Sequence, residues 1–154
     1  MTTIAYDRRT KTVAADTQNT DESGAKWRVK KIETLPDGSV FLGSGHLYTI
    51  AQCKHWAELG FDEHERPDFS YYLEDTEDRG FSCLWISADG AKVILIDGEM
   101  GPTEVIDDFV AIGSGAAYAL GAMEAGADVV RAVEIACERD PSTSAPIHTH
   151  TFGE

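Results

Sequence analysis

Residues 1–16 read MTTIAYDRRTKTVAAD. Apolar residues run or alternate on both sides of the polar turn DRRT, so Thr2–Asp7 and Lys11–Asp16 are predicted to pair as a β-hairpin. The residue after Met1 is small, which is what methionine removal in the cytosol requires. We therefore expect Thr2 to become the first residue, with its hydroxyl at the outer end of a strand.

An N-terminal threonine carries a hydroxyl and an amine on one residue, so the amine can take the hydroxyl proton as the oxygen attacks a carbonyl. The unperturbed α-amine has a pKa of roughly 7.7–8.0, and a neighbouring ammonium lowers that pKa by like-charge repulsion. Lys31 is the candidate for this ammonium, and Asp16 is the candidate for the carboxylate that holds it. From residue types alone, all three side chains could equally be surface features.

Four short segments follow one another along the first third of the chain: TTIAYD at 2–7, AADT at 14–17, VKKI at 29–32 and FLG at 41–43. Together they resemble the proteasome β-subunit family of N-terminal nucleophile hydrolases, and most closely the HslV-type peptidases, as a short bacterial or phage-like member. The resemblance extends to about Phe152 and implies one peptidase domain over 1–154. It is interrupted at 61–80, an acidic, poorly matched region that is either an insertion or a shortened helix.

Hydrophobic spacing predicts an α+β order of antiparallel hairpins and helices. The predicted extended segments are 2–7, 11–16, 27–35, 39–44, 81–87, 92–96, 103–112 and 146–152, the predicted helices are 46–59, 116–125 and 128–139, and 17–26 is predicted to be a loop. The resemblance implies a four-layer αββα sandwich, in which two antiparallel sheets lie between helix layers. Periodicity alone does not select that fold.

Composition limits the classes of partner. The chain has 154 residues, enough for one domain with its own core, and a net charge of −14, which argues against binding to nucleic acid or an anionic membrane. Cys53, Cys83 and Cys137 are odd in number and lie in apolar patterns, as reduced core thiols of a cytosolic protein do. No apolar stretch approaches the roughly 20 residues that span a bilayer, so the expected location is the cytoplasm.

The resemblance assigns roles to residues at both ends of the chain. Thr2 corresponds to the catalytic threonine, Asp16 to its acidic partner and Lys31 to the catalytic lysine. Gly43 corresponds to the glycine whose backbone N–H forms the oxyanion hole, and the nearby His46 either lines the substrate pocket or only begins a helix.

Three more positions follow from the second half of the chain. Ser114, in Gly113-Ser114-Gly115, resembles the serine that relays the proton of the terminal amine, and Asp140 and Thr143 resemble the pair that supports the catalytic threonine. The resemblance requires no cofactor. It implies a sodium ion held by the backbone carbonyls of Cys137, Asp140 and Thr143, but a helix-terminal loop without an ion fits the sequence as well, because carbonyl ligands leave no side-chain signature.

The resulting prediction is a threonine endopeptidase that acts on peptides or unfolded proteins. The resemblance further implies a homo-oligomeric ring and an unfoldase ATPase as a partner. Two alternatives stay open: a catalytically silent, ring-forming scaffold subunit that keeps its methionine, and an N-terminal nucleophile amidase that acts on a small amide.

Overall fold

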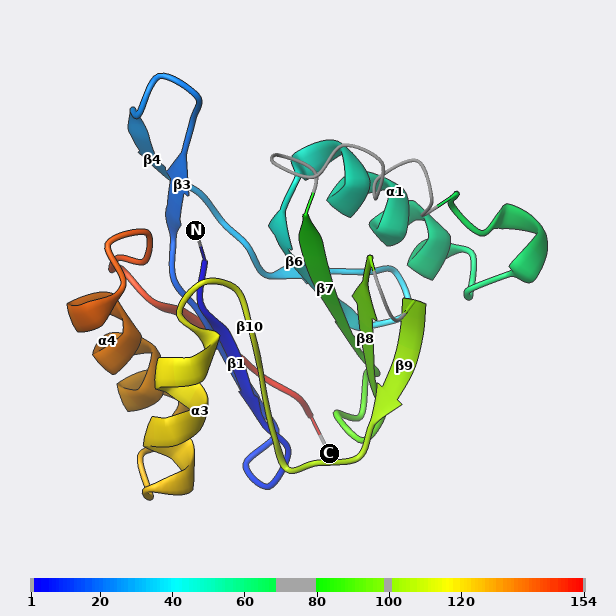
Figure 1. Cartoon of the computed structure of the whole chain (residues 1–154). Helices are drawn as coiled ribbons and strands as arrows, with labels where there is room; N and C mark the ends of the chain where they lie inside the picture. The colour runs from blue at the N-terminus through cyan, green and yellow to red at the C-terminus, as the bar shows by residue number, and fades with distance from the viewer. Residues whose placement is uncertain (1, 69–79, 99–100, 154) are drawn as a thin grey trace. The chain divides into compact units, whose positions relative to one another are not determined.

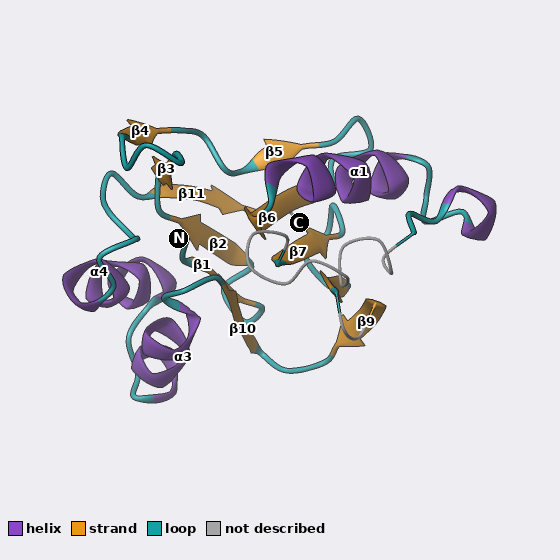
Figure 2. Cartoon of the chain, turned by 45° about the horizontal axis from the view of Figure 1, so that its top comes forward, coloured by secondary structure: helices purple, strands orange, loops and turns teal. Residues whose placement is uncertain are grey.

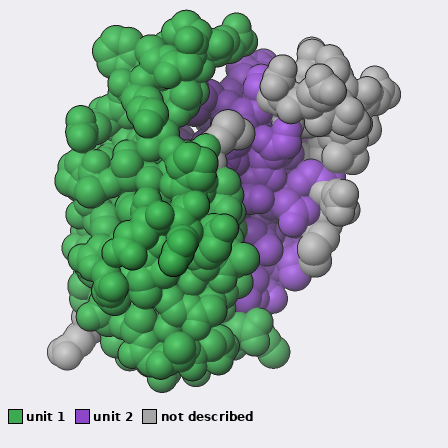
Figure 3. Space-filling view, turned by 60° about the vertical axis from the view of Figure 1, so that its left-hand side comes forward, with its two compact units in different colours: residues 1–32, 106–154 green, residues 33–105 purple. Residues whose placement is uncertain are grey.

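The computed structural model describes residues 2–68, 80–98 and 101–153, and the chain divides into two compact units. Unit 1 consists of Met1–Ile32 and Ile106–Glu154, and unit 2 consists of Glu33–Val105 (Figure 3). Each unit contains an antiparallel sheet and one or two helices (Figure 2). The predicted α+β class with antiparallel hairpins is confirmed.

The main sheet of unit 1 has four antiparallel strands in the order β10-β1-β2-β11. Their bounds are β1 Ile4–Asp7, β2 Thr12–Ala15, β10 Phe109–Ile112 and β11 His148–Thr151. The register pairs Ile4 with Ala15 and Asp7 with Thr12, so the predicted first hairpin is confirmed. Because β1 is central in this sheet, Thr2 and Thr3 immediately before it are held from both sides.

Two helices, α3 (Ala116–Glu124) and α4 (Val129–Arg139), lie side by side across one face of this sheet (Figure 1). Alanines dominate the contact, which lets the helices approach the strands closely. The buried residues of this core are Ala5, Ala14, Ala119, Met123, Val129, Ala132 and Val133. The Asp128 carboxylate accepts the Arg131 N–H at 2.8 Å and caps α4, as predicted.

Two predictions about residues 17–35 were wrong. Part of the expected loop forms a hairpin of β3 (Gln18–Thr20) and β4 (Lys26–Arg28), whose turn is ordered by backbone N–H groups that donate to the Asp21 carboxylate. The strand expected at 27–35 is interrupted: β4 ends at Arg28, residues 29–32 have no regular secondary structure, and Glu33–Thr34 form the short strand β5.

Two adjacent side chains of the segment 29–32 are buried. The Lys31 side chain is 8% exposed and Ile32 is 5% exposed. Lys31 Nζ donates to the Asp16 carboxylate at 2.8 Å, so this segment is held by a side-chain contact and not by pairing with a neighbouring strand.

Unit 2 contains a five-stranded antiparallel sheet in the order β5-β6-β7-β8-β9. Its strands are β5 Glu33–Thr34, β6 Val40–Gly45, β7 Phe81–Ile86, β8 Val93–Asp97 and β9 Gly101–Val105. Helix α1 (Leu47–Glu58) packs on β6 and β7, around a core that includes Phe41, Cys53, Cys83 and Ile96. The predicted helix and the turn between β7 and β8 are confirmed.

The extended segment predicted at 103–112 is two strands of different sheets. Residues 106–108 separate β9 from β10, and Ile106 is 85% exposed. The Asp108 carbonyl accepts the Arg8 N–H at 2.8 Å, which ties this connection to the first hairpin turn. Of the acidic region, the structure describes a short 3₁₀ helix at Glu63–Glu65, whereas 69–79 lie outside the described residues. Among the described helices, none is long and apolar enough to cross a membrane.

Candidate active site

Thr2 lies immediately before β1, and its hydroxyl and its main-chain nitrogen contact different polar groups. The Lys31 ammonium donates to Thr2 Oγ1 at 2.9 Å. The Thr2 nitrogen donates to Ser114 Oγ at 3.2 Å, and the Gly115 N–H donates to the Thr2 carbonyl at 3.2 Å. The side chains predicted to surround Thr2 within unit 1 are therefore brought together.

Asp16, which follows β2, is fully buried and accepts hydrogen bonds at both carboxylate oxygens. Oδ1 accepts from Lys31 Nζ at 2.8 Å and from the Thr3 N–H at 3.0 Å. Oδ2 accepts from the N–H groups of Gln18 at 3.1 Å and Ser144 at 3.2 Å. A buried carboxylate is stable only with such partners, so Asp16 both neutralises Lys31 and ties four segments of unit 1 together.

Burial lowers the pKa of Lys31 below its ordinary value, although the hydrogen bond and the charge of Asp16 act in the opposite direction. A lysine with this balance keeps its ammonium close to Thr2 but releases a proton more readily than an exposed lysine does. A positive charge 2.9 Å from Oγ1 favours the ionised form of the hydroxyl.

A second carboxylate, Asp140 at the end of α4, is connected to the Thr2 nitrogen through Ser114. Ser114 Oγ donates to Asp140 Oδ2 at 2.5 Å, and Thr143 Oγ1 donates to the same oxygen at 2.7 Å. The Ser142 N–H donates to Oδ1 at 3.0 Å. Burial raises the pKa of Asp140, but the hydrogen bonds from Ser114, Ser142 and Thr143 outweigh it, and the net pKa lies below the ordinary value.

Two glycines flank Ser114 for steric reasons. Gly113 has φ +98°, and a Cβ there would lie 2.0 Å from the Thr2 carbonyl oxygen. A Cβ on Gly115 would lie 1.9 Å from Thr3 Oγ1. A side chain at either position would displace Thr2 or Thr3, which precede β1, so the Gly-Ser-Gly sequence is a packing requirement here, not only a flexible turn.

Comparison with solved structures identifies the fold of this chain. A scan of family models found none that matches the sequence, and no curated protein matches it either. Solved structures do match: HslV from Trypanosoma brucei superposes with a TM-score of 0.70 and 23% identity, covering 96% of this chain and 97% of that one. This chain has the HslV fold. The BPH protein of Thiobacillus denitrificans, solved alone and in complex with epoxomicin, matches at a TM-score of 0.66 and 22% identity over 96% of both chains.

The HslV fold confirms the resemblance read from the sequence at the level of architecture. Of the predicted site residues, Thr2, Asp16, Lys31, Ser114, Asp140 and Thr143 all lie in unit 1 and form one connected set of hydrogen bonds. Gly43 lies on β6 in unit 2, where a Cβ would lie 2.4 Å from the Ile50 side chain of α1. Packing in unit 2 is therefore one reason for glycine at position 43, and its role as an oxyanion donor stays a prediction. His46 precedes α1 and contacts Thr49.

The predicted sodium site concerns the backbone around the C-terminus of α4. The Asp140 carbonyl already accepts the Thr143 N–H at 3.2 Å, which uses one lone pair of a proposed ligand. In the part of the chain that the structure describes, no group of three or more His, Cys, Asp and Glu side chains could hold a metal ion. Backbone ligation by Cys137, Asp140 and Thr143 stays a prediction.

Burial, together with the negative charge of Asp16, raises the pKa of the Cys137 thiol to about 11, so the thiol is protonated near neutral pH.

Two side chains of this site were not predicted. Gln18 is buried, and its side-chain amide donates to the Pro141 carbonyl at 3.3 Å and to Thr20 at 3.1 Å. Thr3 is also buried, and its hydroxyl pairs with that of Thr143 at 2.9 Å. The only sequence signal was the doubled threonine at 2–3, which by itself does not indicate an inward hydroxyl.

Proposed function

We propose that this chain is a threonine peptidase that hydrolyses peptide bonds through Thr2, after removal of Met1 gives Thr2 a terminal amine. One observation carries the proposal: Thr2 Oγ1 lies 2.9 Å from Lys31 Nζ while the Thr2 nitrogen lies 3.2 Å from Ser114 Oγ. A nucleophilic oxygen beside a cation, with the base of the same residue held by a separate group, is the arrangement that activates an N-terminal nucleophile.

In the first step, the Thr2 amine takes the proton from Oγ1 as the oxygen attacks the peptide carbonyl. The Lys31 ammonium stabilises the developing negative charge on Oγ1, and Asp16 keeps Lys31 in position. Ser114 Oγ accepts a hydrogen bond from the Thr2 nitrogen and so orients it, while the Ser114 hydroxyl donates its proton in a hydrogen bond to Asp140. The Gly43 N–H is the proposed donor to the oxyanion.

In the second step, the tetrahedral intermediate collapses. The C–N bond of the substrate breaks, the protonated Thr2 amine gives its proton to the departing amine, and an ester links the acyl group to Thr2 Oγ1. The same amine then takes a proton from water as the water oxygen attacks the ester. The bond between the acyl carbon and Oγ1 breaks, Oγ1 regains a proton from the amine, and the acyl group leaves as a carboxylic acid. No step requires a metal ion or a cofactor, and sodium, if bound, would only order the loop after α4.

The proposal extends to assembly and to partners. Its substrates are peptides or unfolded proteins, its assembly is a homo-oligomeric ring, and an unfoldase ATPase is the expected partner. The four-layer αββα sandwich belongs to the same proposal. The resemblance of the sequence and the HslV fold support these points, and a molar mass from light scattering tests the ring directly, because a monomeric mass contradicts it.

Hydrolysis of fluorogenic peptides by wild type, Thr2→Ser and Thr2→Ala tests the chemistry. Serine keeps a hydroxyl beside the amine, so we expect Thr2→Ser to retain measurable turnover and Thr2→Ala to lose it, with unchanged circular dichroism. Full activity of Thr2→Ala contradicts the proposal. Retained Met1 favours the scaffold alternative, and an acylated Thr2 without peptide cleavage favours the amidase.

A further inference from the structure

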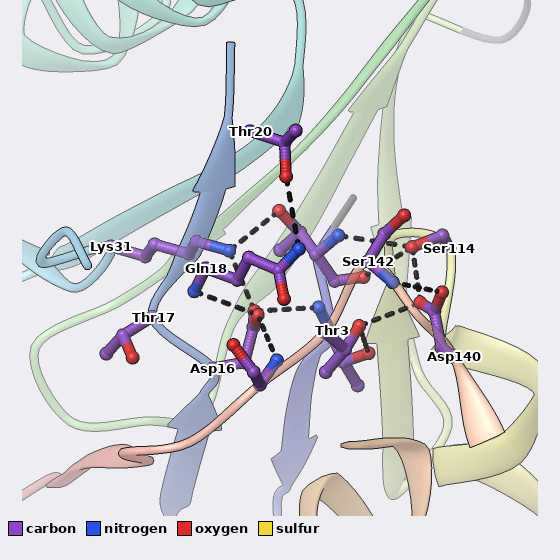
Figure 4. Close-up of polar contacts among 12 residues, drawn as sticks. Thr3, Asp16, Thr17, Gln18, Thr20, Lys31, Ser114, Asp140 and Ser142 are labelled. Carbon is purple, nitrogen blue, oxygen red and sulfur yellow. Dashed lines mark hydrogen bonds and ion pairs between the residues drawn. The ribbon is translucent and has the colours of Figure 1, made fainter. Parts of the chain in front are cut away.

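Two carboxylates are connected to Thr2 through other side chains, and Thr3 lies between these two carboxylates. Asp16 contacts the hydroxyl of Thr2 through Lys31, and Asp140 contacts the nitrogen of Thr2 through Ser114. Figure 4 shows Thr3 lying between Asp16 and Asp140. We propose that Thr3 is a positioning residue that fixes the location of Thr2 and, through Thr143 and Asp140, strengthens the hydrogen bonds that lead to its amine; this inference rests on the proposed function.

Thr3 is anchored at three points next to the nucleophile. Its N–H donates to Asp16 Oδ1 at 3.0 Å, its carbonyl accepts the Asp16 N–H at 3.1 Å, and its hydroxyl pairs with Thr143 at 2.9 Å. The side chain is 0% exposed. Because Thr3 follows Thr2 directly, these bonds also restrict where the Thr2 backbone can lie.

The direction of the Thr3–Thr143 hydrogen bond follows from counting protons. A hydroxyl has one proton to donate, and Thr143 donates its proton to the Asp140 carboxylate, which can only accept. Thr143 Oγ1 must therefore accept from Thr3, so Thr3 is the first donor of the series. Ser114 Oγ lies 2.5 Å from Asp140 Oδ2 and 3.5 Å from the Thr2 carbonyl oxygen, so its proton goes to Asp140 and it accepts from the Thr2 nitrogen.

This ordering matters for the chemistry of the amine. Because Thr143 accepts from Thr3, it donates more strongly to Asp140, since hydrogen bonds in series polarise one another. Asp140 therefore holds its charge better and is a better acceptor for Ser114. The acceptor-only carboxylate of Asp140 sets the direction of the series, and Thr3 strengthens it although its hydroxyl touches no reacting atom.

The packing around the hydroxyl gives a second, independent observation. A Cβ at Gly115 would lie 1.9 Å from Thr3 Oγ1 and 3.0 Å from Ala136 Cβ. The space that a side chain at position 115 would occupy is therefore filled by the Thr3 hydroxyl.

The test compares Thr3→Val, which keeps the shape but removes the hydroxyl, with Thr3→Ser, which keeps the hydroxyl. We expect Thr3→Val to lower kcat about tenfold with an unchanged KM, because about tenfold in rate corresponds to the loss of roughly one hydrogen bond. Thr3→Ser, which keeps the hydroxyl, should restore most of the rate. Thr12→Val is the matched control, because Thr12 forms a similar hydroxyl pair with Thr151 at 3.1 Å on the exposed part of the same sheet. A kcat within twofold of wild type for Thr3→Val overturns the proposal.

Two further measurements do not depend on peptidase activity. In an NMR titration the Asp140 carboxyl should have a higher pKa in Thr3→Val than in wild type, and the Thr12→Val control should leave it unchanged. If wild type lacks peptidase activity but Asp140 responds in this way, the proposed function fails and the link through Thr3 stands. Should Thr3→Val not fold, neutron diffraction of wild type decides: deuterium on Thr3 directed at Thr143 supports the proposal, and deuterium on Thr143 directed at Thr3 overturns it.

Discussion

Replacing Asp16 with asparagine should remove a large part of the stability of the protein. Asparagine keeps one oxygen, so it can serve either the Thr3 N–H and Lys31 or the N–H groups of Gln18 and Ser144, but not both pairs. Two buried N–H donors left without an acceptor cost about 1–3 kcal/mol each. Leaving the buried Lys31 without its counter-charge costs about 3–5 kcal/mol.

Taking the lower ends, Asp16→Asn should reduce the free energy of unfolding by about 5 kcal/mol, comparable to the total stability of many domains. Urea denaturation at pH 7 and one protein concentration measures this. Asp37→Asn is the control: Asp37 is exposed, and Ser39 N and Oγ both donate to its Oδ1, which asparagine retains. A loss for Asp16→Asn no larger than the loss for Asp37→Asn would refute the reasoning.

Three further predictions concern the Asp140 arm of the site. Ser114→Ala should lower kcat about 10- to 100-fold with little change in KM, because the Thr2 nitrogen loses its acceptor, and steady-state kinetics on a fluorogenic peptide measures this. Gly115→Ala should destabilise the fold by about 1–3 kcal/mol through contact with Thr3, whereas Gly121→Ala, in α3 with open space around it, should stabilise by about 0.5–1 kcal/mol; equal melting temperatures would contradict this. The pKa of Asp140 is lowered on folding, so its contribution to stability is present above the ordinary carboxyl pKa and is lost as pH falls through the folded pKa. Between those values the unfolding free energy of wild type should fall more steeply with decreasing pH than that of Asp140→Asn, and parallel curves would argue against a lowered pKa.

The elements that local patterns define were predicted well from the sequence. The first hairpin follows from two apolar runs around a polar turn, and α4 follows from Asp128 and the spacing of Val129 and Val133. The hairpin of β3 and β4 was missed because its residues are almost entirely polar and Trp27 is 59% exposed, so no buried face leaves an alternating pattern. A strand was predicted through Lys31 because the local pattern contains no sign of the contact between Lys31 and Asp16, 15 residues away in the sequence.

The site was predicted unevenly for a related reason. Chemistry alone suggested Thr2 with Asp16 and Lys31, whereas Ser114, Asp140 and Thr143 came only from the family resemblance. The hydroxyl partners Thr3 and Thr143 are 140 residues apart, and no local spacing connects them. The arrangement of hydrogen-bond donors around a buried carboxylate is a property of the fold, which the sequence pattern does not contain.

The most direct test of the proposed chemistry is intact mass before and after treatment with epoxomicin, followed by mapping of the modified residue. A peptide epoxyketone carries two adjacent electrophiles, so a residue that offers both a hydroxyl and an amine is its expected target. We predict a mass without Met1 and one adduct on Thr2 in wild type, and no adduct in Thr2→Ala. A wild-type protein that retains Met1 and stays unmodified would contradict the assignment of Thr2 as the nucleophile.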